Sequence, residues 1–126
     1  MGQSFQIGDI VKGHYKTGTY VGEVTAVRPQ QYLVKIKAVL KHPAQGDLHN
    51  HKEADVPLFH ERRALALNEQ TNIPAQMVRK YEEAVPDYNS SLKNAISELM
   101  IELTKDDSTW AKKSMVNLKQ LEMEYF

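Results

Sequence analysis

The alternation of residue types in "QYLVKIKAVL" (residues 31–40) predicts an extended β-strand. One face of such a strand is apolar throughout and consists of Tyr32, Val34, Ile36 and Ala38. The other face carries two lysines and consists of Leu33, Lys35, Lys37 and Val39. Side chains of a strand point alternately to its two sides, so this segment is expected to cover a core with one face and meet water with the other.

The stretches before this strand predict more strands of the same sheet. "GDIVKGHY" (8–15) and "TYVGEVTAV" (19–27) are rich in β-branched and aromatic residues, and "KTGT" and "RPQQ" supply the turns between them. Gly13 and Gly22 interrupt the strand patterns and indicate bulges or bends. "RRALAL" (62–67) suits a closing strand, although its composition also suits a helix. Residues 1–72 are therefore predicted to form a small SH3-like antiparallel β-barrel or roll.

The hydrophobic period changes after residue 72, so residues 73–126 are predicted to be α-helical. "NIPAQMVRKYEEAV" (72–85) predicts a short helix with Asn72 as its cap and Pro74 near its start. "DYNSSLKNAISELMIELTK" (87–105) carries an apolar stripe of Leu92, Ala95, Ile96, Leu99, Met100 and Leu103. A last helix is predicted from Ser108 to Tyr125, and the short link before it favours an antiparallel helix pair. The fold class is thus α+β, a barrel followed by a helical hairpin.

Composition narrows the functional classes. The chain has 16 basic and 16 acidic residues and no net charge, which disfavours non-specific nucleic-acid binding. It contains no cysteine and no basic segment followed by an apolar one near residue 1. A cytoplasmic protein without signal peptide or lipobox cysteine is expected.

The polar stretch "GDLHNHKEADVPLFHERRAL" (46–65) holds three of the chain's five histidines. One hypothesis is a divalent-metal site, in a binding module or an enzyme, whose ligands would be Asp47, His49, His51 and His60. Their spacing matches no specific metal motif, so the favoured interpretation is an ordered loop over residues 42–62 that binds no cofactor.

Catalysis and nucleic-acid binding are two further candidate functions. Catalysis is disfavoured because the chain lacks a Gly-x-Ser-x-Gly elbow and both glycine-rich nucleotide motifs, while Ser90 and Ser91 suit helix capping. A nucleic-acid-binding barrel would need tyrosines for stacking and lysines for phosphates. The available residues for that role are Tyr15, Tyr20, Tyr32, Lys12, Lys16, Lys35 and Lys37.

Five segments in order resemble the kinase-associated protein B family of endospore-forming Gram-positive bacteria. They are "GDIVKGHYKTGTYVGEV", "HPAQGDLHN", "FHERRALA", "TNIPAQMV" and "WAKKSM". The resemblance implies an SH3-like barrel with a helical extension. It also implies a non-enzymatic role as activator or accessory of a sporulation sensor histidine kinase that feeds a phosphorelay.

The loop over residues 42–62, which holds the most family-like positions, is a candidate surface for a partner. The candidates are His42, Gln45, Asp47, His49, Asn50, His60, Glu61 and Arg62. The helical hairpin, which ends in "LEMEYF", is a second candidate surface, either for a partner or for a homodimer. The family has also been described as a lipoprotein. Because this sequence has no cysteine, any membrane location is expected to come from binding a membrane kinase.

Overall fold

Five antiparallel strands form the N-terminal part of the computed structural model, which describes residues 4–46 and 59–126. The strands are β1 (Ile10–Tyr15), β2 (Gly18–Arg28), β3 (Gln31–Lys41), β4 (Gln70–Pro74) and β5 (Val78–Lys80). Their order in the sheet is β4-β3-β2-β1-β5. The three strands predicted within residues 8–40 are therefore confirmed, together with the α+β class.

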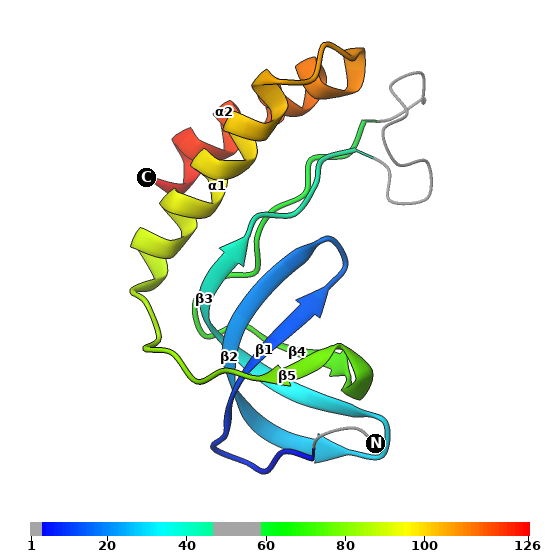
Figure 1. The fold of residues 1–126 in the computed structure, drawn as a ribbon, viewed down its shortest axis with the longest axis vertical. Coiled ribbons are helices and arrows are strands. Elements are labelled where there is room, and N and C mark those ends of the chain that lie inside the picture. Colours follow the sequence, from blue (N-terminus) through cyan, green and yellow to red (C-terminus); the bar gives the residue numbers. More distant parts are fainter. Residues whose placement is uncertain (1–3, 47–58) are drawn as a thin grey trace.

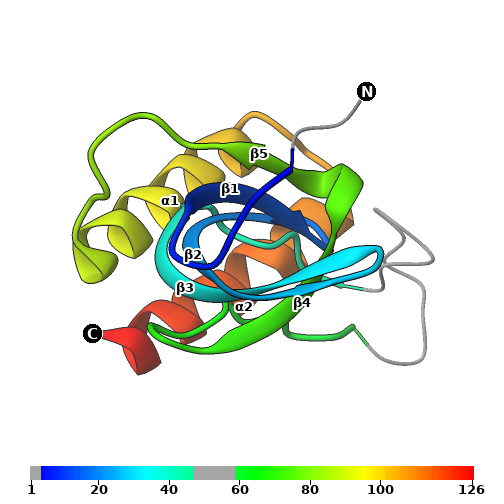
Figure 2. The same cartoon turned by 90° about the horizontal axis from the view of Figure 1, so that it is seen from below.

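Bulges and a glycine bend the two long strands, and Figure 2 shows the sheet wrapping into a roll. A Cβ atom on Gly22 would lie 2.6 Å from the carbonyl oxygen of Lys35, so only glycine allows this approach. The predicted inner face of β3 is buried. Val39 was predicted on the wet face, yet it is 1% exposed. Two register shifts each add a residue to β3 near Ala38 and Val39, and this irregularity turns both side chains inward.

Residues 70–80 correct the predicted short helix at 72–85. They form β4, a 3₁₀ turn (Ala75–Met77) and β5, so the sheet continues beyond residue 72. β4 pairs with β3, and β5 pairs with β1. Asn72 caps no helix; its Oδ1 accepts a hydrogen bond from Nε of Arg28 at 3.0 Å. Backbone pairing with two distant strands thus overrides the local helical spacing of apolar residues.

The helices α1 (Tyr88–Thr104) and α2 (Thr109–Tyr125) form the predicted antiparallel hairpin (Figure 1). Asp87 and Ser108 cap them by accepting hydrogen bonds from the backbone N–H groups of Ser90 and Ala111. Ser91 does not act as a cap. Its buried hydroxyl accepts from the N–H of Val39 and donates to the carbonyl of Tyr88, which fastens the start of α1 to β3.

Two extended segments, residues 42–46 and 59–66, run side by side from the sheet along the hairpin (Figure 1). We call this pair the arm. The closing strand predicted at 62–67 is not formed, because no strand within residues 4–46 and 59–126 pairs with this segment. One hydrophobic cluster fills the sheet and reaches Leu92 and Ala95 of α1. A second cluster lies in the hairpin, with Phe59 and Ala44 of the arm packed against it.

Candidate functional site

The side chain of Gln45 holds the two segments of the arm together. Its Oε1 accepts from the N–H of Arg62 at 2.9 Å, and its Nε2 donates to the carbonyl of Arg62 at 2.9 Å. Gly46 N–H donates to the carbonyl of His60, and Nε of Arg62 donates to the carbonyl of Gly46. The side-chain amide of Gln45 thus makes the pair of hydrogen bonds that the backbone of a neighbouring strand would otherwise make.

The hydroxyl of Tyr125 fastens the end of α2 to the arm. It accepts from the N–H of Ala64 at 2.9 Å and lies 3.0 Å from Nε2 of His42. Nδ1 of His42 lies 3.0 Å from the carbonyl of Pro43, which can only accept, so Nδ1 carries the proton. Burial lowers the pKa of His42 and keeps the ring neutral. The Tyr125 hydroxyl therefore donates a hydrogen bond to Nε2, and every polar atom of the pair has a hydrogen-bond partner.

Two more tyrosines satisfy the backbone of the arm at Leu65. The hydroxyl of Tyr20 accepts from its N–H at 3.3 Å, and the hydroxyl of Tyr88 donates to its carbonyl at 2.6 Å. Burial raises the pKa of Tyr20, and it raises the pKa of Tyr88 to about 12, so both hydroxyls stay protonated. The arm is therefore positioned by side chains from β2, α1 and α2.

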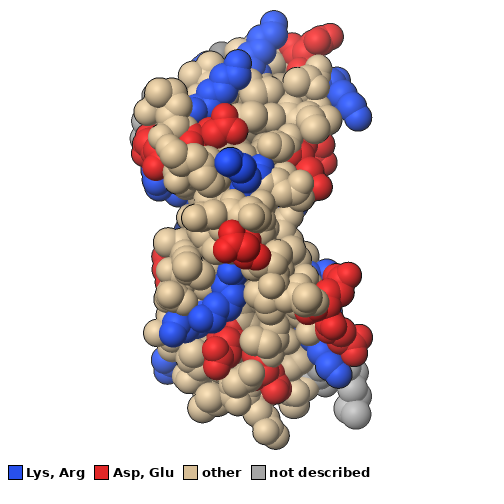
Figure 3. All heavy atoms as spheres, turned by 90° about the vertical axis from the view of Figure 1, so that its left-hand side faces the viewer, with Lys and Arg blue, Asp and Glu red and all other residues tan. Residues whose placement is uncertain are grey.

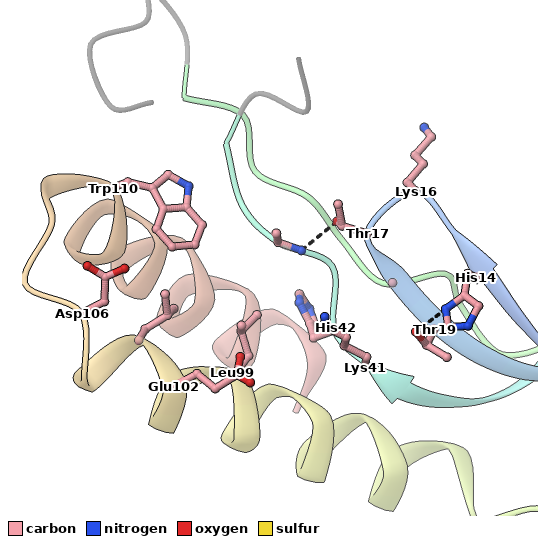
Figure 4. A pocket seen from close by; sticks show the side chains of 13 residues that line it. His14, Lys16, Thr17, Thr19, Lys41, His42, Leu99, Glu102, Asp106 and Trp110 are labelled. Carbon is pink, nitrogen blue, oxygen red and sulfur yellow. Dashed lines mark hydrogen bonds between the residues drawn. The ribbon is translucent and has the colours of Figure 1, made fainter. Parts of the chain in front are cut away.

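A crevice of about 600 Å³ opens where the sheet, the arm and the hairpin meet (Figure 4). Its strand side is the β1–β2 turn with His14, Lys16 and Thr19, and its helix side carries Glu102, Asp106 and Trp110. Lys41 and His42, at the end of β3, continue the strand side toward the helices. The size falls within the range of about 300–1,000 Å³ that is usual for binding pockets.

The crevice has an apolar floor and walls of opposite charge. Leu99, Leu103 and Trp110 contribute the floor, and the indole N–H of Trp110 donates to the carbonyl of Gln45 at 3.2 Å. Lys41 on one side and Glu102 on the other are exposed, and neither forms an ion pair within residues 4–46 and 59–126. Figure 3 shows that charges of both signs also mix on one outer side of the molecule. The crevice thus offers separated, opposite charges above an apolar floor.

The predicted partner-binding residues divide into three groups. His42 and Gln45 are 0% and 3% exposed, so their side chains build the arm, and partner contact by either stays a prediction. Glu61 is exposed, while His60 and Arg62 are half-buried; partner contact by these three stays a prediction. Asp47, His49 and Asn50 lie outside the described residues.

The two alternative sites have different outcomes. Within residues 4–46 and 59–126, no three His, Asp or Glu side chains gather closely enough to hold a metal ion. His51, like Asp47 and His49, lies outside that part, so the metal hypothesis stays untested. The stacking role predicted for Tyr20 and Tyr32 is wrong, because these side chains are 2% and 7% exposed and belong to the core. Tyr15 is half-buried, and stacking on its ring stays a prediction.

Comparison with known proteins gives matches along nearly the whole chain. A family model described as "Kinase associated protein B" matches residues 15–126. Kinase-associated lipoprotein B of Bacillus subtilis (strain 168) is 62% identical over 123 residues, which cover 98% of this chain and 96% of that protein. The crystal structure of kinase-associated protein B from Bacillus cereus is 51% identical. It has a TM-score of 0.83 and covers 97% of this chain and 98% of its own.

The helices offer no sign of a membrane span. Within the described ranges, none is both long enough and apolar enough to cross a bilayer.

The matched residues 15–126 include the sheet, the arm, the hairpin and all of the crevice lining except His14. The chain therefore belongs to the kinase-associated protein B family.

Proposed function

We propose that the protein is a non-catalytic accessory factor that binds and activates a sporulation sensor histidine kinase at the head of a phosphorelay. The observation that carries the proposal is the near full-length match to a relative named as kinase-associated. The match covers the sheet, the hairpin and the crevice between them, which supports a partner-binding surface similar to that of the relative.

The architecture is suited to such a role. We propose that the curved sheet is an SH3-like barrel, since its strand order and the 3₁₀ turn between β4 and β5 agree with that fold. The barrel and the hairpin meet at the arm, whose two segments are held by buried side chains of His42 and Gln45. A rigid junction of this kind presents a preformed surface, and preformed surfaces bind with less loss of conformational entropy.

Location and assembly follow from the same proposal. The sequence contains no cysteine, whereas the Bacillus subtilis relative is named a lipoprotein. We propose that this protein is cytoplasmic and reaches the membrane by binding the kinase.

A homodimer through the helical region is a further proposal. The exposed apolar side chains of Val116 and Met123 on α2 support it, because they lie two turns apart on one helix face.

Binding to purified kinases tests the proposed function. The cytoplasmic parts of the sporulation sensor kinases of the source bacterium would be titrated with the full chain by isothermal calorimetry. Saturable binding to one kinase is expected, and deletion of the gene should lower the output of that kinase and delay sporulation. Absence of binding to every kinase, with normal sporulation in the deletion strain, would contradict the proposal.

A further inference from the structure

The crevice between the sheet and the hairpin identifies the kind of surface that its partner must present. Its two sides come from segments far apart in the chain, the β1–β2 turn and the end of α1 (Figure 4). In the part of the chain that the structure describes, neither Lys41 nor Glu102 forms an ion pair, so each can meet a charge from a partner. An occupant of one sign would be attracted by one side and repelled by the other.

The acidic side is reinforced by the helix on which it lies. The last turn of α1 contains Glu102 and no basic residue, and the exposed Lys105 follows only as the C-cap. The carbonyl end of a helix carries a partial negative charge, which is normally balanced by a cation. Over residues 102–107 three carboxylates and this partial negative charge meet one ammonium group, so this end of α1 favours a positive group from a partner.

The basic side has a different character. Lys41 is the last residue of β3 and is exposed, and the buried His42 follows it in the chain. Nζ of Lys16 lies 5.4 Å from the ring centre of Tyr15, so this lysine already contacts an aromatic face. Lys41 is thus the cation best placed to meet an acidic group.

The floor between these charges is apolar. Leu99, Leu103 and Trp110 belong to the buried cluster of the hairpin, and they border a space larger than ordinary packing gaps. Water over an apolar floor is displaced favourably by an apolar group. A phosphate chain would be repelled by Glu102 and Asp106, and a metal cation by Lys41. A protein segment satisfies the charges and the floor together.

We infer that the crevice receives a segment of the kinase that inserts one large apolar side chain between an acidic residue facing Lys41 and a basic residue facing Glu102. This inference rests on the proposed function, because it names the surface through which that binding takes place. The apolar side chain supplies most of the affinity, and the flanking charges orient the segment.

Charge reversal gives the first test, by calorimetry with the purified cytoplasmic part of the kinase. Lys41→Glu and Glu102→Lys should each weaken binding about 3- to 10-fold, as expected for exposed charges that lose an attraction and gain a repulsion. Lys119→Glu on the outer face of α2 and Glu83→Lys before α1 are matched controls outside the crevice lining. Each control should stay within about twofold of the wild type.

The absence of cysteine allows a second test that fills the crevice. Lys41→Cys labelled with a bulky maleimide should lose at least about tenfold in affinity, whereas Lys119→Cys with the same label should bind normally. An unchanged melting temperature and an unchanged far-UV circular dichroism spectrum would show that each variant is folded.

The outcomes separate the two proposals. If the wild type binds the kinase and all variants bind equally well, the crevice inference is wrong and the proposed function stands. That result is also expected if the crevice serves a small molecule or a second copy of this chain. If the wild type binds no sensor kinase, both the proposed function and the inference are overturned. Selective loss in the Lys41 and Glu102 variants supports both.

Discussion

Removal of one hydroxyl, in Tyr125→Phe, tests how the hairpin is attached to the arm. The substitution keeps the ring and deletes the oxygen that serves His42 and the N–H of Ala64. A buried group left without its partner costs about 1–3 kcal/mol. His42 is fully buried, whereas Tyr125 is only half-buried, so water can reach Ala64 more easily. We therefore expect the free energy of unfolding to fall by about 2–3 kcal/mol.

Urea unfolding followed by Trp110 fluorescence measures this loss, because the chain's single tryptophan is buried between the hairpin and the arm. Tyr81→Phe is the matched control. Its hydroxyl makes one exposed contact of 3.4 Å with the carbonyl of Ala84 and should matter by less than about 0.5 kcal/mol. If Tyr125→Phe is as stable as Tyr81→Phe, the proposed attachment through His42 does not exist.

Three other changes test the arm. Burial lowers the pKa of His42, so below about pH 6.5 the unfolded chain binds more protons than the folded protein does. The free energy of unfolding should therefore decrease as the pH falls, by up to about 1.4 kcal/mol per pH unit. Urea titrations from pH 7 to 5.5 measure this, and a free energy of unfolding that does not change with pH would contradict it. Gln45→Ala should cost about 2–4 kcal/mol, measured in the same way, because it unpairs the arm; a loss below about 0.5 kcal/mol would show that the amide is dispensable. Gly46→Ala should destabilise more than Gly8→Ala in thermal melts. Both have positive φ, but only at Gly46 would a Cβ meet Phe59, at 3.0 Å, so equal losses would rule out that contact.

The elements that could be predicted from the sequence are those whose periodically spaced apolar residues are buried in the fold. The alternation of residues 32–38 and the stripe of Leu92, Ile96, Leu99 and Leu103 both correspond to buried side chains. The prediction failed at residues 72–85, where the apolar spacing resembles a helix. There the backbone of β4 pairs with β3, and that of β5 pairs with β1. Pairing with strands tens of residues away leaves no local signal in the sequence.

The site was harder to predict than the fold. Tyr125 and His42 are 83 positions apart, and Trp110 and Gln45 are 65 apart, so no spacing rule connects them. The sequence analysis named His42 and Gln45 as partner contacts, whereas in the structure their buried side chains hold the arm together. Residues 62–66 are extended but pair with none of the described strands, so their backbone groups need other hydrogen-bond partners. The tyrosines Tyr20, Tyr88 and Tyr125 were the available signal for such groups.

The most direct test of the account is the rate at which the partner kinase phosphorylates itself. The purified kinase would be assayed with ATP, alone and with saturating amounts of the wild-type chain. The Lys41→Cys variant carrying the maleimide label would be compared at the same concentration. We predict that the wild-type chain raises the rate and that the labelled variant does not. A rate that is unchanged by the wild-type chain would contradict kinase activation, and equal activation by the labelled variant would contradict binding through the crevice.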